Sequence, residues 1–275
     1  MSIANSNYKK FSKGESISVK ANFFLKGSSN FILGIAILFG IWWFFVFLVT
    51  LNPDYELFFD FGLMPALKAI PSLWQDGTIP LGIQNSGYRL GMGLLISILI
   101  GVPVGILMGR VPWFKKLFNV PFQFFRMVSP LSWEPIAVVV FLAWNDAIIF
   151  LIAIASVWPI IFATSAGLEK VDPNWFKVAR NLGASPLQML TRIILPAIAF
   201  DVITGIRLAL GVAWIVLIPA EFLGVTSGFG FAVQDGRESM LYDNLMGLIV
   251  VIGAVGYVLD SICVVLINKF AWRKA

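Results

Sequence analysis

Uncharged stretches long enough to cross a lipid bilayer are the feature that most constrains this chain. Residues 31–50 and 90–109 are 20-residue runs without a charged side chain, and residues 147–168 are a 22-residue run of the same kind. The hydrocarbon core of a bilayer is about 30 Å thick and needs about 20 apolar residues in a helix. These runs predict membrane-spanning helices, because a helix satisfies its backbone hydrogen bonds internally in lipid.

Three further spans are expected in apolar stretches that contain one to three charged side chains. The six predicted spans are 31–50, 86–109, 118–142, 147–168, 198–221 and 244–268. Composition agrees with this fold class, an all-α membrane protein, because only 13% of the residues are charged and the mean hydropathy is +0.87. A water-soluble domain is roughly a quarter charged, so a soluble enzyme is excluded.

The distribution of positive charge predicts which side of the membrane each loop faces. Most of the 20 Lys and Arg residues lie in the N-terminal segment 1–30, after the second span, in the loop 169–197 and in the tail 269–275. Cytoplasmic loops carry such an excess of basic residues, so both termini are expected in the cytoplasm around a single membrane domain, 31–268. A signal peptide is rejected for the first span, because its apolar run is too long and no cleavage site follows it.

Missing residue types exclude several kinds of chemistry. The chain has no histidine and a single cysteine, Cys263, which excludes histidine-based catalysis, histidine-ligated metals and an internal disulfide. A membrane-embedded enzyme therefore has little chemistry available, and no catalytic residue, metal site or bound cofactor is expected. The sequence also lacks the glycine-rich phosphate loop of ATP-binding proteins. Any ATP hydrolysis must belong to a separate subunit.

The loop 169–197 contains residues that typically start and end two short helices. Asp172 before Pro173 is a helix N-cap followed by proline at the first helical position, and Ser185 before Pro186 repeats this pattern. Gly183 lies where a left-handed helix terminator is needed. We therefore expect helices over 173–182 and 186–195 that meet at a sharp turn.

Apolar residues on this loop favour contact with a partner over a solvated connector. Phe176, Val178, Ala179 and Leu182 have no domain of their own in which to be buried. A DNA-binding helix-turn-helix is the other structural interpretation, but both ends of the loop enter the bilayer within a few residues. No nucleic-acid partner is expected.

The loop resembles a known family. Ala179, Gly183, Ile193, Leu195 and Pro196 match the spacing of the EAA signature of permease subunits in binding-protein-dependent ABC importers, although Lys177 and Val178 replace its Glu and first Ala. Further motifs are similar to the nitrate, sulfonate, bicarbonate and taurine branch of these permeases. They are Ser129–Pro135, Gly205–Arg207 with Trp214 and Glu221, and Ser227–Gly230.

This resemblance implies a type I importer architecture in a bacterial inner membrane. It implies a second permease copy in a homodimer, two cytoplasmic ATPase subunits that bind ATP and Mg, and an extracytoplasmic solute-binding protein. In the family the loop seats on the ATPase. The implied coupling residues are Lys177, Val178, Ala179, Arg180, Gly183, Ala184, Ser185 and Leu187.

Polar groups at membrane depth are candidates for a translocation pathway, because charge in the bilayer normally faces a cavity, a partner charge or a path. In the third span the prolines around 129–135 break the helix and expose backbone groups, which makes Ser129, Ser132, Trp133 and Glu134 candidates. A kink that only shapes packing is the alternative. The outer loop 223–243 is either a plug or a connector.

Arg207, Trp214 and Glu221 are spaced seven residues apart, so they lie on nearly one helical face. They could line an anion path, with Glu221 near the outer mouth. Alternatively, Arg207 and Asp260 lie at similar depth and neutralise each other. The leading prediction is an ATP-driven permease for a small oxyanion that works by alternating access, and the alternative is a stand-alone secondary transporter or channel for a small anion.

Overall fold

The computed structural model describes residues 33–52, 58–222 and 224–271, and these residues form helices without a strand. The chain divides into two units, Met1–Pro65 and Ala66–Ala275. In the first unit the helix Leu33–Thr50 is long and apolar enough to span a membrane. In the same unit Trp42 Nε1 donates a hydrogen bond to the Phe61 carbonyl oxygen at 3.0 Å. The predicted segment 1–30 lies outside the described residues.

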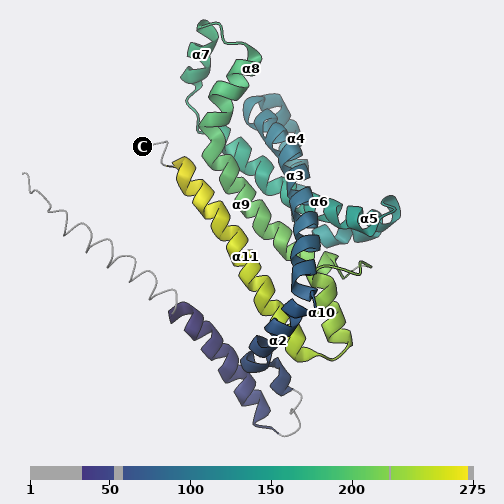
Figure 1. Cartoon of the computed structure of the whole chain (residues 1–275). Coiled ribbons are helices and arrows are strands. Elements are labelled where there is room, and N and C mark those ends of the chain that lie inside the picture. Colours follow the sequence, from purple (N-terminus) through teal and green to yellow (C-terminus); the bar gives the residue numbers. More distant parts are fainter. Residues whose placement is uncertain (1–32, 53–57, 223, 272–275) are drawn as a thin grey trace, which may run out of the picture. The chain divides into compact units, whose positions relative to one another are not determined.

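The second unit contains the other spanning helices and the loop between them (Figure 1). Helix α2 (Leu63–Gln75) crosses the boundary between the units. In chain order the following elements are α3 (Thr78–Arg110), α4 (Pro112–Met127), η2 (Pro130–Trp133), α5 (Glu134–Val140), α6 (Trp144–Glu169), α7 (Pro173–Asn181), α8 (Pro186–Gln188), η3 (Met189–Ile194), α9 (Leu195–Ala220), α10 (Phe229–Glu238) and α11 (Tyr242–Ala271).

An all-α membrane protein is confirmed. Five helices of the described chain are long and apolar enough to span a membrane, namely Leu33–Thr50, Thr78–Arg110, Trp144–Glu169, Pro186–Ala220 and Tyr242–Lys269, and a shorter apolar helix covers Pro130–Val140. The sides of the membrane that the loops face remain a prediction.

The third predicted span, 118–142, is not one helix. Helix α4 ends at Met127, and Val128 and Ser129 are extended, with ψ angles of 129° and 127°. A residue before proline is disfavoured in the helical region because the proline ring clashes with its backbone, so Pro130 ends α4 and starts the short helix η2. The predicted interruption by proline is therefore a complete break.

Small residues let α3 and α6 approach closely. A Cβ atom placed on Gly93 would lie 2.4 Å from Ile152 Cγ2, and one on Gly105 would lie 2.6 Å from Thr164 Cβ. Ser97, between these glycines, is buried and donates to the Ala153 carbonyl oxygen at 2.9 Å. Close approach of small residues supplies the van der Waals contact that holds helices together in lipid. Helix α6 is the centre of the unit, with 61% of its apolar window buried.

Candidate functional site

The loop after α6 is built as its capping residues predict. Asp172 Oδ1 accepts a hydrogen bond from the Asn174 backbone N–H at 2.9 Å and caps α7, whose first residue is Pro173. Gly183 follows α7 with a φ angle of +77°, in the left-handed region that favours glycine. The first helix and the sharp turn of the prediction are therefore confirmed.

The second helix of the loop does not end at Pro196. It begins with a capping box, in which the Gln188 N–H donates to Ser185 Oγ at 3.3 Å and the Ser185 N–H donates to Gln188 Oε1 at 2.9 Å. The helix then widens to π geometry over Met189–Ile194 and continues as α9. Because a wide turn relaxes the normal i to i−4 pairing, it accommodates a proline that would clash within a regular helix.

Half of the apolar residues that were expected to be exposed on the loop face inward instead. Phe176 and Ala179 are each 7% exposed and belong to a core cluster with Leu168, Met189 and Ile198. The reason is helical geometry, because residues three apart share a face and this face of α7 covers the start of α9. Exposed apolar side chains remain on the outer face of the loop, and they are Trp175, Val178, Leu182 and Leu187.

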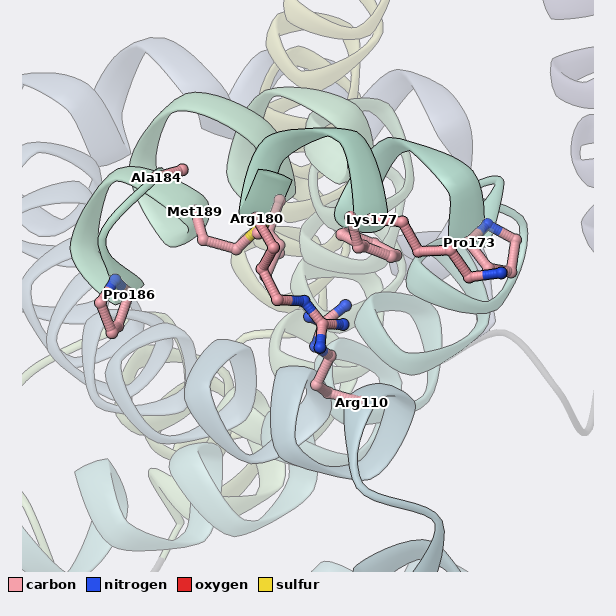
Figure 2. A pocket seen from close by; sticks show the side chains of 9 residues that line it. Arg110, Pro173, Lys177, Arg180, Ala184, Pro186 and Met189 are labelled. Atoms are coloured by element: carbon pink, nitrogen blue, oxygen red, sulfur yellow. The ribbon is translucent and has the colours of Figure 1, made fainter. Parts of the chain in front are cut away.

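A cavity of about 860 Å³ opens beside this loop, between α7, the start of η3 and the end of α3 (Figure 2). Its lining residues are Arg110, Pro173, Phe176, Lys177, Arg180, Ala184, Pro186, Met189 and Ile194. The guanidinium of Arg110 lies over the Phe176 ring, 4.1 Å from its centroid, and Figure 2 shows the side chain of Arg180 extending to meet it. We call this the basic cavity, because its three charged lining residues are all cations.

The predicted coupling residues therefore lie in three different environments on this loop. Lys177, Arg180 and Ala184 line the basic cavity. Val178 and Leu187 are exposed and Ala179 is buried. Gly183 and Ser185 shape the backbone.

The pathway candidates of the broken third span differ in their exposure. Ser129 and Ser132 are exposed, while Trp133 and Glu134 are half-buried. The Trp133 ring lies 6.1 Å from the Phe125 ring and packs on the central apolar core. Ser129 precedes η2, Ser132 lies on η2 and Glu134 begins α5, all beside the break after α4.

Arg207 forms an ion pair at the centre of α9. Its Nε and Nη2 atoms donate to the two carboxylate oxygens of Asp260 on α11, at 2.6 and 2.7 Å. The two side chains are 41% and 46% exposed, so the pair is not sealed within this chain. Trp214, about two turns further along α9, is half-buried against Phe229 and Gly256.

Glu221 does not line an open mouth, which corrects the expectation that it lies on a path with Arg207. Its side chain is 0% exposed and forms an ion pair with Arg89 of α3, with Nη1 and Oε1 2.6 Å apart. Ser86 Oγ lies 2.9 Å from both carboxylate oxygens, and the Gly230 N–H donates to Oε2 at 2.8 Å. A carboxylate with this many partners is fixed in place rather than free to bind a passing solute.

Arg89 links four segments around that carboxylate. It donates to the Ser227 carbonyl oxygen and hydroxyl at 2.7 and 3.1 Å, and to Asn145 Oδ1 of α6 at 2.9 Å. The segment before α10 passes close by, because a Cβ on Gly228 would lie 2.5 Å from Glu221 Oε1. We call Arg89, Glu221, Ser86, Ser227 and Asn145 the buried ion-pair network. Part of the loop 223–243 is thus the helix α10, and its first residues, Phe229 and Gly230, donate to Ser86 and Glu221.

No pattern in the sequence indicated a role for Arg89. The available signal was weak: Arg89 and Glu221 are opposite charges at the edges of two predicted spans. Nothing in the spacing, 132 residues apart, indicates that they meet.

These features define a multi-pass integral membrane protein with a structured, capped loop at one end of its helices and a buried ion-pair network at the other. The chain belongs to the family described as binding-protein-dependent transport system inner membrane component, which matches residues 101–274. It is therefore an inner-membrane permease component of the ABC importer class, as the sequence resemblance predicted.

Named relatives transport different solutes. A bicarbonate transport system permease protein of Synechococcus elongatus is 37% identical over 174 residues, which cover 62% of this chain and 62% of that protein. A taurine transport system permease protein of Escherichia coli is 31% identical over 82% of both chains. A nitrate import permease protein of Leptolyngbya laminosa is 32% identical over 66% of this chain and 64% of that protein.

Proposed function

We propose that this chain is the transmembrane permease subunit of an ATP-driven importer for a small oxyanion of the nitrate, bicarbonate, sulfonate or taurine type. The names of the relatives support this class of substrate, because bicarbonate and nitrate are small oxyanions and taurine carries a sulfonate. An extracytoplasmic solute-binding protein delivers the anion, and the permease moves it by alternating access.

The observation that carries this proposal is the capped loop with its exposed apolar face. Trp175, Val178, Leu182 and Leu187 are 57% to 82% exposed on a segment that hydrogen bonds hold at both helix starts. An ordered apolar surface of this kind is typical of a binding site for another protein. We assign it to one of two ATPase subunits in the cytoplasm, which bind the ATP and Mg, and the loop of the second permease copy to the other.

A second permease copy completes the proposed assembly. Helix α11 has only 6% of its apolar window buried, and the Arg207–Asp260 pair lies half exposed between α9 and α11. Charges at mid-membrane are costly against lipid and normally face a bundle interior or a water-filled path. A homodimer with the path between its copies places this pair away from lipid, where Arg207 supports the passage of an anion.

Substitutions at Gly183 test the coupling role. The space around Gly183 is open, but its φ angle of +77° strains most side chains. We expect Gly183→Val and Gly183→Trp to distort the turn and lose the ATPase from the complex purified from native membranes. Gly183→Asn is the matched control, because asparagine tolerates left-handed geometry, and it should keep the ATPase and its activity.

The alternative function class gives a different result in the same experiment. A secondary transporter or channel would purify without an ATPase and would carry a small anion into liposomes without ATP. That outcome would replace the proposed function.

A further inference from the structure

We propose that the basic cavity receives an acidic side chain of the ATPase partner, so that this permease docks through a cationic loop. The proposal rests on the function proposed above and names the chemistry of the partner's contact. Arg110, Lys177 and Arg180 contribute three positive charges to the lining, which contains no carboxylate.

These three cations have no acidic partner within the described part of the chain. The ion pairs found there join Arg89 to Glu221, Lys115 to Glu169, Lys170 to Asp201 and Arg207 to Asp260. Arg110 is held over the Phe176 ring, and Figure 2 shows Arg180 reaching toward Arg110 rather than away from it. Like charges that gather without a counter-charge repel each other, and an anion between them removes that repulsion.

The positive charge of Lys177 determines whether the complementary group on the partner is an acid or a base. Lys177 stands where the signature that this loop resembles has Glu, and an acidic side chain there would be complementary to a base on a partner. The lysine reverses the charge, so the complementary group on the partner of this chain is an acid. Two guanidinium groups suit a carboxylate well, because each offers paired donors to its two oxygens.

A protein carboxylate fits the cavity better than a lipid phosphate because of what borders the opening. Lys177 and Arg180 are exposed on α7, and two exposed apolar residues of the proposed docking face lie close to them in the chain, Val178 on the same helix and Leu182 at its C-cap. A partner that covers these apolar side chains therefore also reaches the cations. Charge complementarity at such a contact mainly supplies specificity and rate of association.

The test measures binding of the ATPase subunits that co-purify with the wild type to full-length variants in detergent. Lys177→Gln/Arg180→Gln removes two charges and Lys177→Glu/Arg180→Glu reverses them. The matched control, Lys116→Glu/Lys269→Glu, makes the same charge change at two exposed lysines outside the cavity. We expect the control to bind as the wild type does, the neutral variant about tenfold more weakly and the reversed variant weaker still, with the difference shrinking at high salt.

Suppression identifies the partner's residue. Selection for transport by the reversed variant, with the ATPase gene mutagenised, should return substitutions of Asp or Glu by Lys or Arg on the docking surface of the ATPase. Both altered positions are exposed, so size-exclusion profiles should match those of the wild type, and the neutral variant keeps the test decisive if the reversed one misfolds.

Other outcomes would overturn the proposal in distinguishable ways. Unchanged binding by the neutral variant, with binding still lost in Gly183→Val, would refute the carboxylate contact and leave the coupling role intact. If binding by the wild type required phosphatidylglycerol in nanodiscs and the neutral variant had lost that requirement, the cavity would hold a lipid phosphate instead. A wild type that binds no ATPase would refute both proposals.

Discussion

Removing the charge of Glu221 should destabilise the end of the bundle that the buried ion-pair network holds. The side chains of Arg89 and Glu221 are 2% and 0% exposed, so Glu221→Gln leaves a buried guanidinium without a counter-ion. Breaking a buried pair by removing one partner costs about 3–5 kcal/mol. Glutamine keeps an oxygen that accepts from the Gly230 N–H, which places the expected cost near the lower limit.

The assay is the apparent melting temperature of the detergent-purified protein, followed by fluorescence-detected size exclusion. For a chain of this size, 1 kcal/mol shifts Tm by about 2–4 °C, so a loss of about 3 kcal/mol lowers it by about 6–12 °C. Hydrogen exchange should rise first around the start of α10, because the Arg89 side chain that donates to Ser227 loses its counter-ion.

A double-mutant cycle separates the ion pair from simple loss of packing. Arg89→Met removes the guanidinium, and in that background Glu221→Gln should cost much less than it does alone, because no unpaired cation remains. Additive effects of the two substitutions would show that the charges do not stabilise each other. A Glu221→Gln protein as stable as the wild type would refute the reasoning outright.

Three further predictions concern packing, transport and capping. Gly93→Ala should destabilise the α3–α6 contact by about 1–3 kcal/mol, measured as a lower Tm, because its new methyl group overlaps Ile152; an unchanged Tm would contradict this. Arg207→Gln should slow uptake of the anion by reconstituted complexes about tenfold, and adding Asp260→Asn should restore balanced charge but not transport; normal uptake by the single variant would exclude a path role. Ser185→Ala should weaken the start of α8 by about 1 kcal/mol, seen as faster hydrogen exchange over 186–194, while melting of the spanning helices stays unchanged.

The sequence predicted the features that local physics decides. Apolar runs of the length of a bilayer located the spanning helices, and Asp172, Gly183 and Ser185 located the helix starts and the turn of the loop. A cap or a left-handed glycine acts within a few residues of itself, so its effect can be inferred from its neighbours in the chain.

Features that depend on distant partners were missed or misjudged. Pro130 breaks the third span completely, whereas Pro196 lies inside a continuous helix that has π geometry in the turn before the proline. Phe176 looked like an exposed contact residue, but the start of α9 covers it. Glu221 looked like a pathway residue because its partner Arg89 lies on another helix, 132 residues away in the chain.

Helix α9 connects the three charged features of the second unit. The capped loop leads into α9 without a break, the Arg207–Asp260 pair lies at its centre, and Glu221 is its C-cap in the buried ion-pair network. Helical hydrogen bonding continues from Pro186 to Ala220, so we expect this helix to move largely as a unit. A displacement of the proposed docking loop would therefore be transmitted to the half-exposed pair, while the network fixes the far end of α9 to α3 and α6. Rotation about that fixed end would change what Arg207 faces, which is the kind of motion that the proposed alternating access requires.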